Sequence, residues 1–259
     1  MTTVLVTGGT GLLGRAVAGE LTAAGHTVRI LSRRPGGPGT AVGDLATGAG
    51  LDTALQGVDA VVHSASDPRD PRPVDVDGTR RLVAAARRAG EPHLVYVSIV
   101  GIDRIPWPYY RAKLAAERAV GASGLPWTIL RATQFHEFTA DLLARLTRLP
   151  VVPAPRGWRF QPVDVREVAA RFAATVDAGP AGRLPDLGGP QVLTVAELAQ
   201  LHLRATGRRR RVVAVPVPGA FSRSLRAGAN LAPSGCSAGR TYAEFLAERA
   251  GTVPTGSTS

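Results

Sequence analysis

Short hydrophobic runs, rich in β-branched residues, alternate along the first half of the chain with amphipathic stretches. The runs lack strict polar alternation, which is typical of strands in a parallel sheet that is buried on both faces. The stretches between them have the apolar spacing of helices with one buried face. The predicted strands are Thr3–Thr7, Thr27–Leu31, Thr40–Val42, Asp59–His63, His93–Ser98 and Trp127–Arg131, and the predicted helices are Leu12–Ala24, Val74–Ala89, Tyr109–Val120 and Phe135–Thr147. This alternation predicts an α/β fold of Rossmann type, with a doubly wound parallel sheet.

The pattern loosens after Arg131, where prolines and glycines mark loops. Two further helices are predicted there, Asp164–Val176 with Asp164 as N-cap, and Thr194–Ala205, in which Thr194 and Glu197 have capping-box spacing. We expect residues 1–133 to form the Rossmann core. Residues 134–259 are expected to complete that core and to form a small C-terminal lobe that covers the substrate, within a single compact domain. The tail 251–259 is rich in Gly, Ser and Thr and is expected to be frayed.

The chain is basic, with 31 Lys and Arg against 20 Asp and Glu in 259 residues and a net charge of +11. Its arginines are scattered, and the one dense run, Arg208–Arg211, has no aromatic residues among it. This distribution favours a field that attracts anionic cofactors and substrates over nucleic-acid binding. We therefore expect a small-molecule substrate and no nucleic-acid partner.

Several other classes of protein are not expected from this sequence. No apolar run approaches the roughly 20 residues that span a bilayer, and the N-terminus begins as a strand rather than as a signal peptide. The single cysteine, Cys236, excludes an internal disulfide and a cysteine-rich metal site. No His, Asp and Glu cluster has metal-ligand spacing, so no metal is expected. A cytoplasmic protein is the expectation, and the sequence does not indicate its oligomeric state.

A glycine-rich turn joins the first predicted strand to the first predicted helix, with the sequence Gly-Gly-Thr-Gly-Leu-Leu-Gly at 8–14. Glycines permit a tight turn and close approach of the backbone to a pyrophosphate, and the helix N-terminus favours an anion. Because the strand and the helix supply the required context, the turn predicts a dinucleotide site. The expected contacts are Gly8, Thr10, Gly11, Leu12, Leu13 and Gly14.

The second predicted strand ends in Ser32, Arg33 and Arg34, about twenty residues beyond the glycines, where an acidic residue would hold the ribose of NAD. Two arginines and a serine suit a 2′-phosphate instead, through charge-assisted hydrogen bonds. The expected cofactor is therefore NADP(H) in preference to NAD(H).

With these motifs the sequence resembles the short-chain dehydrogenase/reductase superfamily, in its atypical NmrA-like branch. The resemblance rests on the spacing of the three glycines, on segments 43–45, 63–66 and 130–131, and on segments 162–165 and 187–190. It covers nearly the whole chain and becomes unspecific after about Arg208. The resemblance implies a Rossmann fold, an NAD(P) cofactor, adenine contacts at Asp44 and Leu45, and cofactor contacts at Ser64, Ala65 and Ser66. It implies the chemistry less strongly, because the branch includes both reductases and non-catalytic redox-sensing proteins.

Tyr109 and Lys113 are four residues apart and therefore share a face of the predicted helix. Of the 31 basic residues, Lys113 is the only lysine, which indicates a position where arginine does not serve. A nearby ammonium is expected to lower the pKa of the Tyr109 phenol, so that Tyr109 acts as general acid or base. Lys113 can also hold the nicotinamide ribose. Tyr110 could face the same way, although the family pattern matches Tyr109.

Classical members of the family place a further hydroxyl near the end of the fifth strand. Here Ser98 is the candidate, but a shift of one residue would reverse its face, so both a catalytic and a supporting role stay open. Substrate contacts are expected at Gln134, Phe135 and His136. His63 is interpreted as a structural residue that lines the cofactor site. Glu117 is interpreted as a surface residue that could pair with Lys113.

These observations favour an NADPH-dependent oxidoreductase that transfers hydride to or from a small organic carbonyl or alcohol. Tyr109 and Lys113 would be its catalytic pair. Two alternatives stay open, a non-catalytic NADP(H)-binding redox sensor and an epimerase that works through a transient ketone. The sequence does not identify the substrate or the direction of the reaction.

Overall fold

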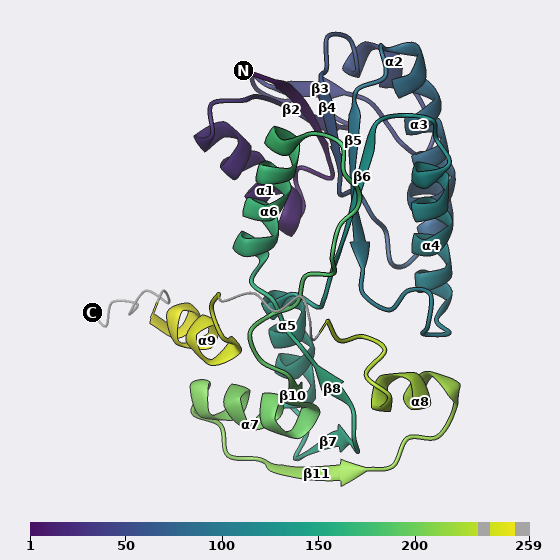
Figure 1. Cartoon of the computed structure of the whole chain (residues 1–259). Coiled ribbons are helices and arrows are strands. Elements are labelled where there is room, and N and C mark those ends of the chain that lie inside the picture. The colour runs from purple at the N-terminus through teal and green to yellow at the C-terminus, as the bar shows by residue number, and fades with distance from the viewer. Residues whose placement is uncertain (233–238, 252–259) are drawn as a thin grey trace, which may run out of the picture. The chain divides into compact units, whose positions relative to one another are not determined.

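The computed structural model describes residues 1–232 and 239–251, and they fall into two compact units. Cys236 and residues 252–259 of the tail lie outside the described residues. The first unit contains residues 1–132 and 165–186, and the second contains residues 133–164 together with the described residues from 187 onward (Figure 1).

The first unit is built on a seven-stranded sheet in the order β3-β2-β1-β4-β5-β6-β9, in which every neighbouring pair is parallel. The first six strands follow the order of a doubly wound nucleotide-binding fold, with the reversal between β1 and β4. The strands are β1 (Thr3–Thr7), β2 (Thr27–Ser32), β3 (Thr40–Val42), β4 (Ala60–His63), β5 (His93–Ile99), β6 (Trp127–Ala132) and β9 (Gly182–Arg183).

Helices cover both faces of this sheet (Figure 1). On one face lie α1 (Leu12–Ala23) and α6 (Val165–Ala178), which pack against each other. On the other face lie α2 (Leu51–Ala54), α3 (Thr79–Arg88) and α4 (Pro108–Gly121). One core cluster joins strand residues such as Leu5, Val61 and Leu94 to helix residues such as Leu82 and Val120. The predicted Rossmann-type fold is confirmed.

The helix predicted at Val74–Ala89 differs from expectation in its first part. It begins as a π-helical turn, η1 (Arg72–Gly78), and continues as α3. Gly78 lets this turn lie close to Leu45, because a Cβ on Gly78 would be 3.1 Å from the Leu45 Cβ. The turn also buries Asp75, which is 1% exposed.

The second unit contains α5 (His136–Leu146), α7 (Val195–Ala205), α8 (Ala220–Arg226) and α9 (Tyr242–Gly251). Two small sheets accompany them, in which β7 (Val151–Pro155) pairs in parallel with β11 (Arg211–Val215) and β8 (Arg159–Phe160) pairs antiparallel with β10 (Leu193–Thr194). The capping box predicted for α7 is present, since Thr194 Oγ1 accepts from Glu197 N at 3.2 Å and Glu197 Oε2 accepts from Thr194 N at 2.7 Å. Asp164, predicted as an N-cap, forms an ion pair with Arg240 at 2.7 Å.

None of the helices in residues 1–232 and 239–251 has both the length and the hydropathy needed to cross a membrane.

Candidate active site

The glycine turn between β1 and α1 is closely packed. Gly8 has a φ of +69°, and its carbonyl accepts a hydrogen bond from Gly11 N at 2.9 Å. A Cβ on Gly14 would lie 2.1 Å from the Gly8 oxygen, so only glycine fits at position 14 without a shift of the backbone. Gly11 is the N-cap of α1, and no side chain in the described part of the protein caps the first turn of the helix. Thr10, Gly11 and Leu12 are exposed, which leaves the helix N-terminus open to an anion, as the pyrophosphate of a dinucleotide requires.

The segment after β4 lies directly against this turn. A Cβ on Gly8 would be 2.7 Å from the Ala65 Cα, and Ser64 Oγ donates to Thr7 O at 2.7 Å. The expected cofactor residues Gly8, Ser64 and Ala65 are thus brought together at the carboxyl ends of β1 and β4.

His63 ends β4 and has both ring nitrogens within hydrogen-bond distance of threonine hydroxyls, 2.7 Å to Thr7 and 2.9 Å to Thr79. Burial, with a smaller contribution from Lys113, lowers the pKa of His63 to about 3. The ring is therefore neutral and ties β1, β4 and α3 together, in agreement with the structural interpretation of this residue.

The residues expected at the adenosine end behave differently from one another. Arg33 and Arg34 are exposed after β2, and Ser32 Oγ accepts a hydrogen bond from Arg34 N at 3.2 Å. Asp44 Oδ1 accepts from Ala46 N at 2.9 Å and so shapes its own turn. Leu45 is 7% exposed and belongs to the core cluster, so in this structure it packs inside the unit.

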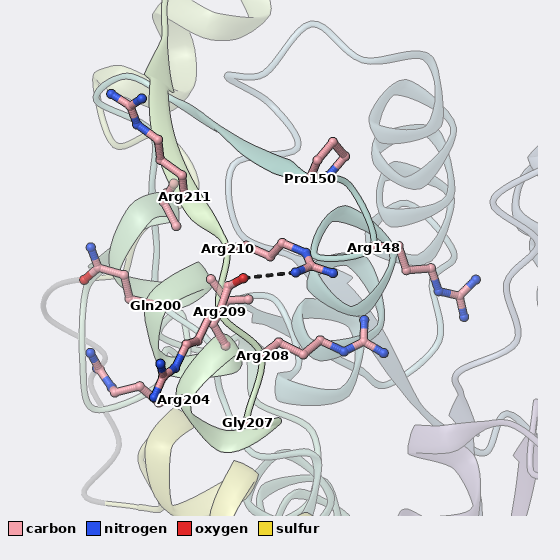
Figure 2. Close-up of a pocket in the computed structure, with 11 residues that line it drawn as sticks. Arg148, Pro150, Gln200, Arg204, Gly207, Arg208, Arg209, Arg210 and Arg211 are labelled. Carbon is pink, nitrogen blue, oxygen red and sulfur yellow. Dashed lines mark hydrogen bonds between the residues drawn. The ribbon is translucent and has the colours of Figure 1, made fainter.

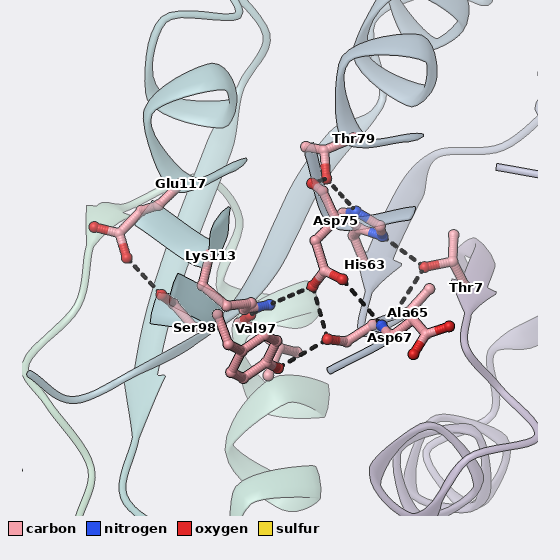
Figure 3. A network of polar contacts seen from close by, with 12 residues as sticks. Thr7, His63, Ala65, Asp67, Asp75, Thr79, Val97, Ser98, Lys113 and Glu117 are labelled. Atoms are coloured by element: carbon pink, nitrogen blue, oxygen red, sulfur yellow. Dashed lines mark hydrogen bonds and ion pairs between the residues drawn. The ribbon is translucent and has the colours of Figure 1, made fainter. Parts of the chain in front are cut away.

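A chain of polar contacts runs from Tyr109 to Lys113 through Ser66, in the segment after β4, and Asp75 of η1 (Figure 3). The Tyr109 hydroxyl lies 2.8 Å from Ser66 Oγ, and Ser66 Oγ donates to Asp75 Oδ1 at 2.7 Å. Because Ser66 gives its proton to the carboxylate, the Tyr109 hydroxyl is the donor to Ser66. Asp75 Oδ2 also accepts from Asp67 N at 2.9 Å, and Asp75 Oδ1 is 3.9 Å from Lys113 Nζ.

Lys113 is buried, with 5% of its side chain exposed. Its ammonium donates to Val97 O at 2.9 Å and lies 4.4 Å from the centre of the Tyr96 ring. Burial lowers the pKa of Lys113 to about 8, while the carboxylates of Asp75 and Glu117 raise it in part. The lysine therefore carries a proton that it can lose close to physiological pH.

The expectation that Lys113 lowers the pKa of Tyr109 is wrong for this structure. Burial raises the pKa of Tyr109 to about 12, and the charge of Asp75 also raises it, while hydrogen bonding with Ser66, which can donate to the phenolate, lowers it in part. The ammonium interacts with Asp75, Val97 and Tyr96 instead of with the phenol. Tyr110 is 7% exposed, and its ring packs against those of Trp107 and Tyr109.

Ser98 belongs to a different network. Its hydroxyl donates to Glu117 Oε2 at 2.5 Å, and Glu117 also accepts two hydrogen bonds from Arg131, at 2.6 and 2.9 Å. Arg131 in turn forms an ion pair with Asp103 at 3.1 Å. Glu117 is thus buried and paired with Arg131, not exposed and paired with Lys113 as expected. For Ser98 this geometry favours the supporting role.

The three expected substrate contacts lie in the second unit. His136 is fully buried, donates from Nε2 to Arg240 O at 2.9 Å, and packs its ring against Tyr242 and Phe245. It is therefore a core residue of that unit and not a surface contact. Phe135 is half-buried at the N-cap of α5, and Gln134 O accepts from Val163 N at 2.9 Å.

Asp75 is the residue of this site that the sequence pattern did not single out. The sequence feature that could have identified it is an acidic residue within the predicted helix Val74–Ala89, four positions before Thr79. In the structure the Thr79 hydroxyl donates to Asp75 O at 2.5 Å. An acid at a buried helix position needs partners.

The described residues contain no group of three or more His, Cys, Asp or Glu able to hold a metal ion.

A family model described as NAD(P)H-binding matches residues 8–148, which span the glycine turn, the Tyr109 network and α5. The chain belongs to this NAD(P)H-binding family. The resemblance to the short-chain dehydrogenase/reductase superfamily, in its NmrA-like branch, is also confirmed.

Two curated relatives of this NAD(P)H-binding chain are reductases. A (4-alkanoyl-5-oxo-2,5-dihydrofuran-3-yl)methyl phosphate reductase from Streptomyces griseus is 38% identical over 79% of this chain and 74% of the relative. A chloroplastic divinyl chlorophyllide a 8-vinyl-reductase from Oryza sativa is 31% identical over 83% of this chain, which spans only 62% of that relative.

Solved structures agree on the fold. An NADPH-dependent quinone oxidoreductase from Escherichia coli, in complex with NADPH, matches 95% of this chain and 99% of its own with a TM-score of 0.80 at 19% identity. A short-chain dehydrogenase/reductase superfamily protein from Agrobacterium tumefaciens, with bound NAD, matches 96% of each chain with a TM-score of 0.72 at 25% identity.

Proposed function

We propose that this chain is an NADPH-dependent reductase that adds hydride to a small organic acceptor, with Tyr109 as the proton donor. The observation that carries the proposal is the polar chain from Tyr109 through Ser66 and Asp75 to Lys113, which passes through the segment packed against the glycine turn. In a parallel α/β sheet this end of the strands is where ligands bind.

The cofactor would be held by groups whose chemistry fits it. The open N-terminus of α1 and the exposed backbone at 10–12 would receive the pyrophosphate. Arg33 and Arg34, both exposed, would receive the 2′-phosphate and so favour NADPH over NADH. When bound, the nicotinamide supplies the hydride.

Tyr109 suits the role of an acid in the reductive direction. With a pKa of about 12 its phenol keeps its proton at neutral pH. After the proton passes to the substrate, Ser66 can turn its hydroxyl from Asp75 toward the phenolate, because it already lies 2.8 Å from that oxygen. The ammonium of Lys113 would then replace the proton of Ser66 by way of the Asp75 carboxylate, which lies 3.9 Å from it.

The acceptor would be a carbonyl or a double bond activated by one. The Streptomyces griseus relative is named for a dihydrofuranone that carries an alkanoyl group, and the Oryza sativa relative for a vinyl group. A carbon–carbon double bond is common to both named compounds, and it is a group that the proposed hydride transfer could reduce.

The test is single-turnover oxidation of NADPH, followed at the nicotinamide absorbance, with a panel of short enones, ketones and an alkanoyl dihydrofuranone methyl phosphate. Tyr109→Phe should slow hydride transfer by about 10²- to 10⁴-fold, because it removes a positioned acid and keeps the ring. Its NADPH affinity should be unchanged, since the glycine turn and Arg33 are intact.

Tyr110→Phe is the matched control and should keep nearly full activity. A Tyr109→Phe protein with wild-type rates would reject Tyr109 as the acid. Tight NADPH binding without turnover of any acceptor would instead support the redox-sensing alternative.

A further inference from the structure

The second unit carries a strongly basic groove that the proposed reductase does not use. It has a volume of about 1130 Å³ and is formed by α7, the loop that follows it, β11 and the segment after α5 (Figure 2). No acidic side chain of the described residues lines this groove. Six arginines do, and none of them is ion-paired with an Asp or Glu among the described residues; they are Arg148, Arg204, Arg208, Arg209, Arg210 and Arg211.

A second cavity of about 470 Å³ adjoins the groove and is largely apolar. Arg148 and Arg208 line both, so the two cavities share part of their walls. The apolar part of the second cavity's wall comes from three helices and consists of Ala140 and Ala144 of α5, Ala205 of α7, and Leu246 and Ala250 of α9. Its volume is within the range of small-molecule sites.

The charges of two arginines affect a histidine in the wall of this apolar cavity. His202, which lines it, is 5% exposed, and its pKa is lowered by burial and by the charges of Arg249 and Arg208. Arg249 has a partner, Asp141, at 3.4 Å, whereas Arg208 has no acidic partner among the described residues. The cavity therefore combines apolar side chains with the positive charge of Arg208, which no acidic side chain of the described residues pairs.

We propose that the groove and the adjoining cavity together bind an amphipathic organic phosphate. The phosphate would lie on Arg148 and Arg208, where guanidinium groups can make paired, charge-assisted hydrogen bonds, and the apolar chain would lie between α5, α7 and α9. Phosphate is a group that several planar guanidinium forks recognise well. The inference is independent of the proposed function, because none of these residues belongs to the Tyr109 network.

Two other anionic partners fit the site less well. Binding of single-stranded nucleic acid uses aromatic platforms for the bases, and within the described ranges no Phe, Tyr or Trp lines either cavity. An acidic protein segment would match the arginines but would leave the apolar cavity without a role.

The experiment is calorimetric titration of the full chain with decyl phosphate, below the concentration at which it forms micelles. Methyl phosphate and decyl glucoside serve as probes of the head and the chain alone. Decyl phosphate should bind about tenfold or more tightly than either, since each lacks one of the two sets of contacts.

Variants separate the two parts of the site. Arg148→Gln/Arg208→Gln should weaken the binding of decyl phosphate about tenfold or more. The control Arg87→Gln/Arg118→Gln removes two exposed arginines from α3 and α4 and should leave this binding unchanged. Ala205→Phe should fill the apolar cavity, so that it weakens the binding of decyl phosphate and leaves the binding of methyl phosphate unchanged. Its control is Ala84→Phe, at another exposed helix position. All four variants should still bind NADPH in preference to NADH, which shows that each has folded.

Equal affinity for decyl glucoside and decyl phosphate would overturn the proposal, as would wild-type binding in Arg148→Gln/Arg208→Gln. Vesicles of phosphatidic acid distinguish a membrane from a single molecule, and binding to vesicles without binding of monomeric decyl phosphate would also overturn it. So would a single-stranded oligonucleotide or polyglutamate that binds more tightly at the same salt and loses its affinity in the double variant.

Discussion

Asp75 organises the candidate active site at the scale of single residues. Its carboxylate accepts hydrogen bonds from Ser66 and from the Asp67 amide, and it faces the ammonium of Lys113 at 3.9 Å. An ammonium buried to this degree needs an opposite charge or several acceptors nearby. Asp75, Val97 O and the Tyr96 ring supply them, and Asp75 is the only full charge within ion-pair distance of Lys113 in the described part of the chain.

This arrangement predicts how Lys113 titrates. Because Lys113 is the only lysine in the sequence, protein labelled with ¹³C at lysine Cε gives a single lysine signal, whose pH dependence reports this group alone. Without cofactor the midpoint should lie near pH 8. In Asp75→Asn it should move to lower pH, because the variant removes the carboxylate that does most to stabilise the ammonium, while burial still opposes it.

Asp67→Asn is the matched control for this measurement. The Asp67 side chain accepts from the amides of Arg69 and Asp70 and lies outside the charges that act on Lys113. Its midpoint should therefore stay near that of the wild type. A midpoint close to the ordinary lysine value in the wild-type protein, or an upward shift in Asp75→Asn, would show that burial and Asp75 do not set the charge of Lys113.

At the scale of elements, the β1–turn–α1 unit depends on glycine at particular positions and not along its whole length. Gly14 and Gly19 lie in the same helix, yet a Cβ on Gly14 would be 2.1 Å from the Gly8 oxygen and a Cβ on Gly19 would meet nothing within 4 Å. The contact of a Cβ on Gly14 is with a backbone atom, so it can be relieved only if the turn moves away from the helix.

The pair makes a direct comparison of two glycine-to-alanine changes in one helix. Gly14→Ala should destabilise the protein by about 1–3 kcal/mol through overpacking and should weaken NADPH binding, because the turn must open. Gly19→Ala should stabilise it by roughly 0.5–1 kcal/mol, as alanine does in a helix interior. Urea unfolding and NADPH titration measure both effects. Equal stabilities for the two variants would show that the turn tolerates a side chain at Gly14.

The elements of the first unit follow from the sequence because burial on both faces of a parallel sheet leaves continuous apolar runs. The strands predicted at Thr3–Thr7 and Thr40–Val42 are found unchanged, and those predicted at Asp59–His63 and Trp127–Arg131 differ by one residue at one end. The π-helical turn at 72–78 is not predictable in this way, since its apolar spacing resembles that of the helix it precedes.

Side-chain partners distant in the sequence are harder to predict than elements. The spacing of Glu117 from Lys113 suggests a surface pair on one helix, but Glu117 is paired with Arg131 of β6. His136 follows a strand end, where substrate contacts are common, yet its surroundings are set by Tyr242 and Phe245, more than a hundred residues later. Such contacts depend on tertiary packing and not on local pattern.

At the scale of the whole molecule, the net charge of +11 gives the protein a positive field. Such a field raises the rate at which anions arrive, and salt screens it with a Debye length of about 10 Å at 0.1 M. Because NADPH carries a phosphate that NADH lacks, its association should be the more sensitive to salt.

Local contacts and the overall field can be separated by comparing two variants of equal net charge, each +9 because two arginines are replaced and 11 − 2 = 9. Arg33→Gln/Arg34→Gln removes the residues proposed to receive the 2′-phosphate, and Arg87→Gln/Arg118→Gln removes two exposed arginines of α3 and α4. Stopped-flow fluorescence with NADPH and NADH at several salt concentrations measures association and dissociation.

The wild-type protein should prefer NADPH by roughly tenfold or more, as one or two charge-assisted hydrogen bonds would give. The first variant should lose this preference mainly through faster dissociation of NADPH, whereas the second should keep it and lose only part of the salt-dependent association rate. Equal affinities for NADPH and NADH in the wild-type protein would refute the assignment of Arg33 and Arg34 to the 2′-phosphate.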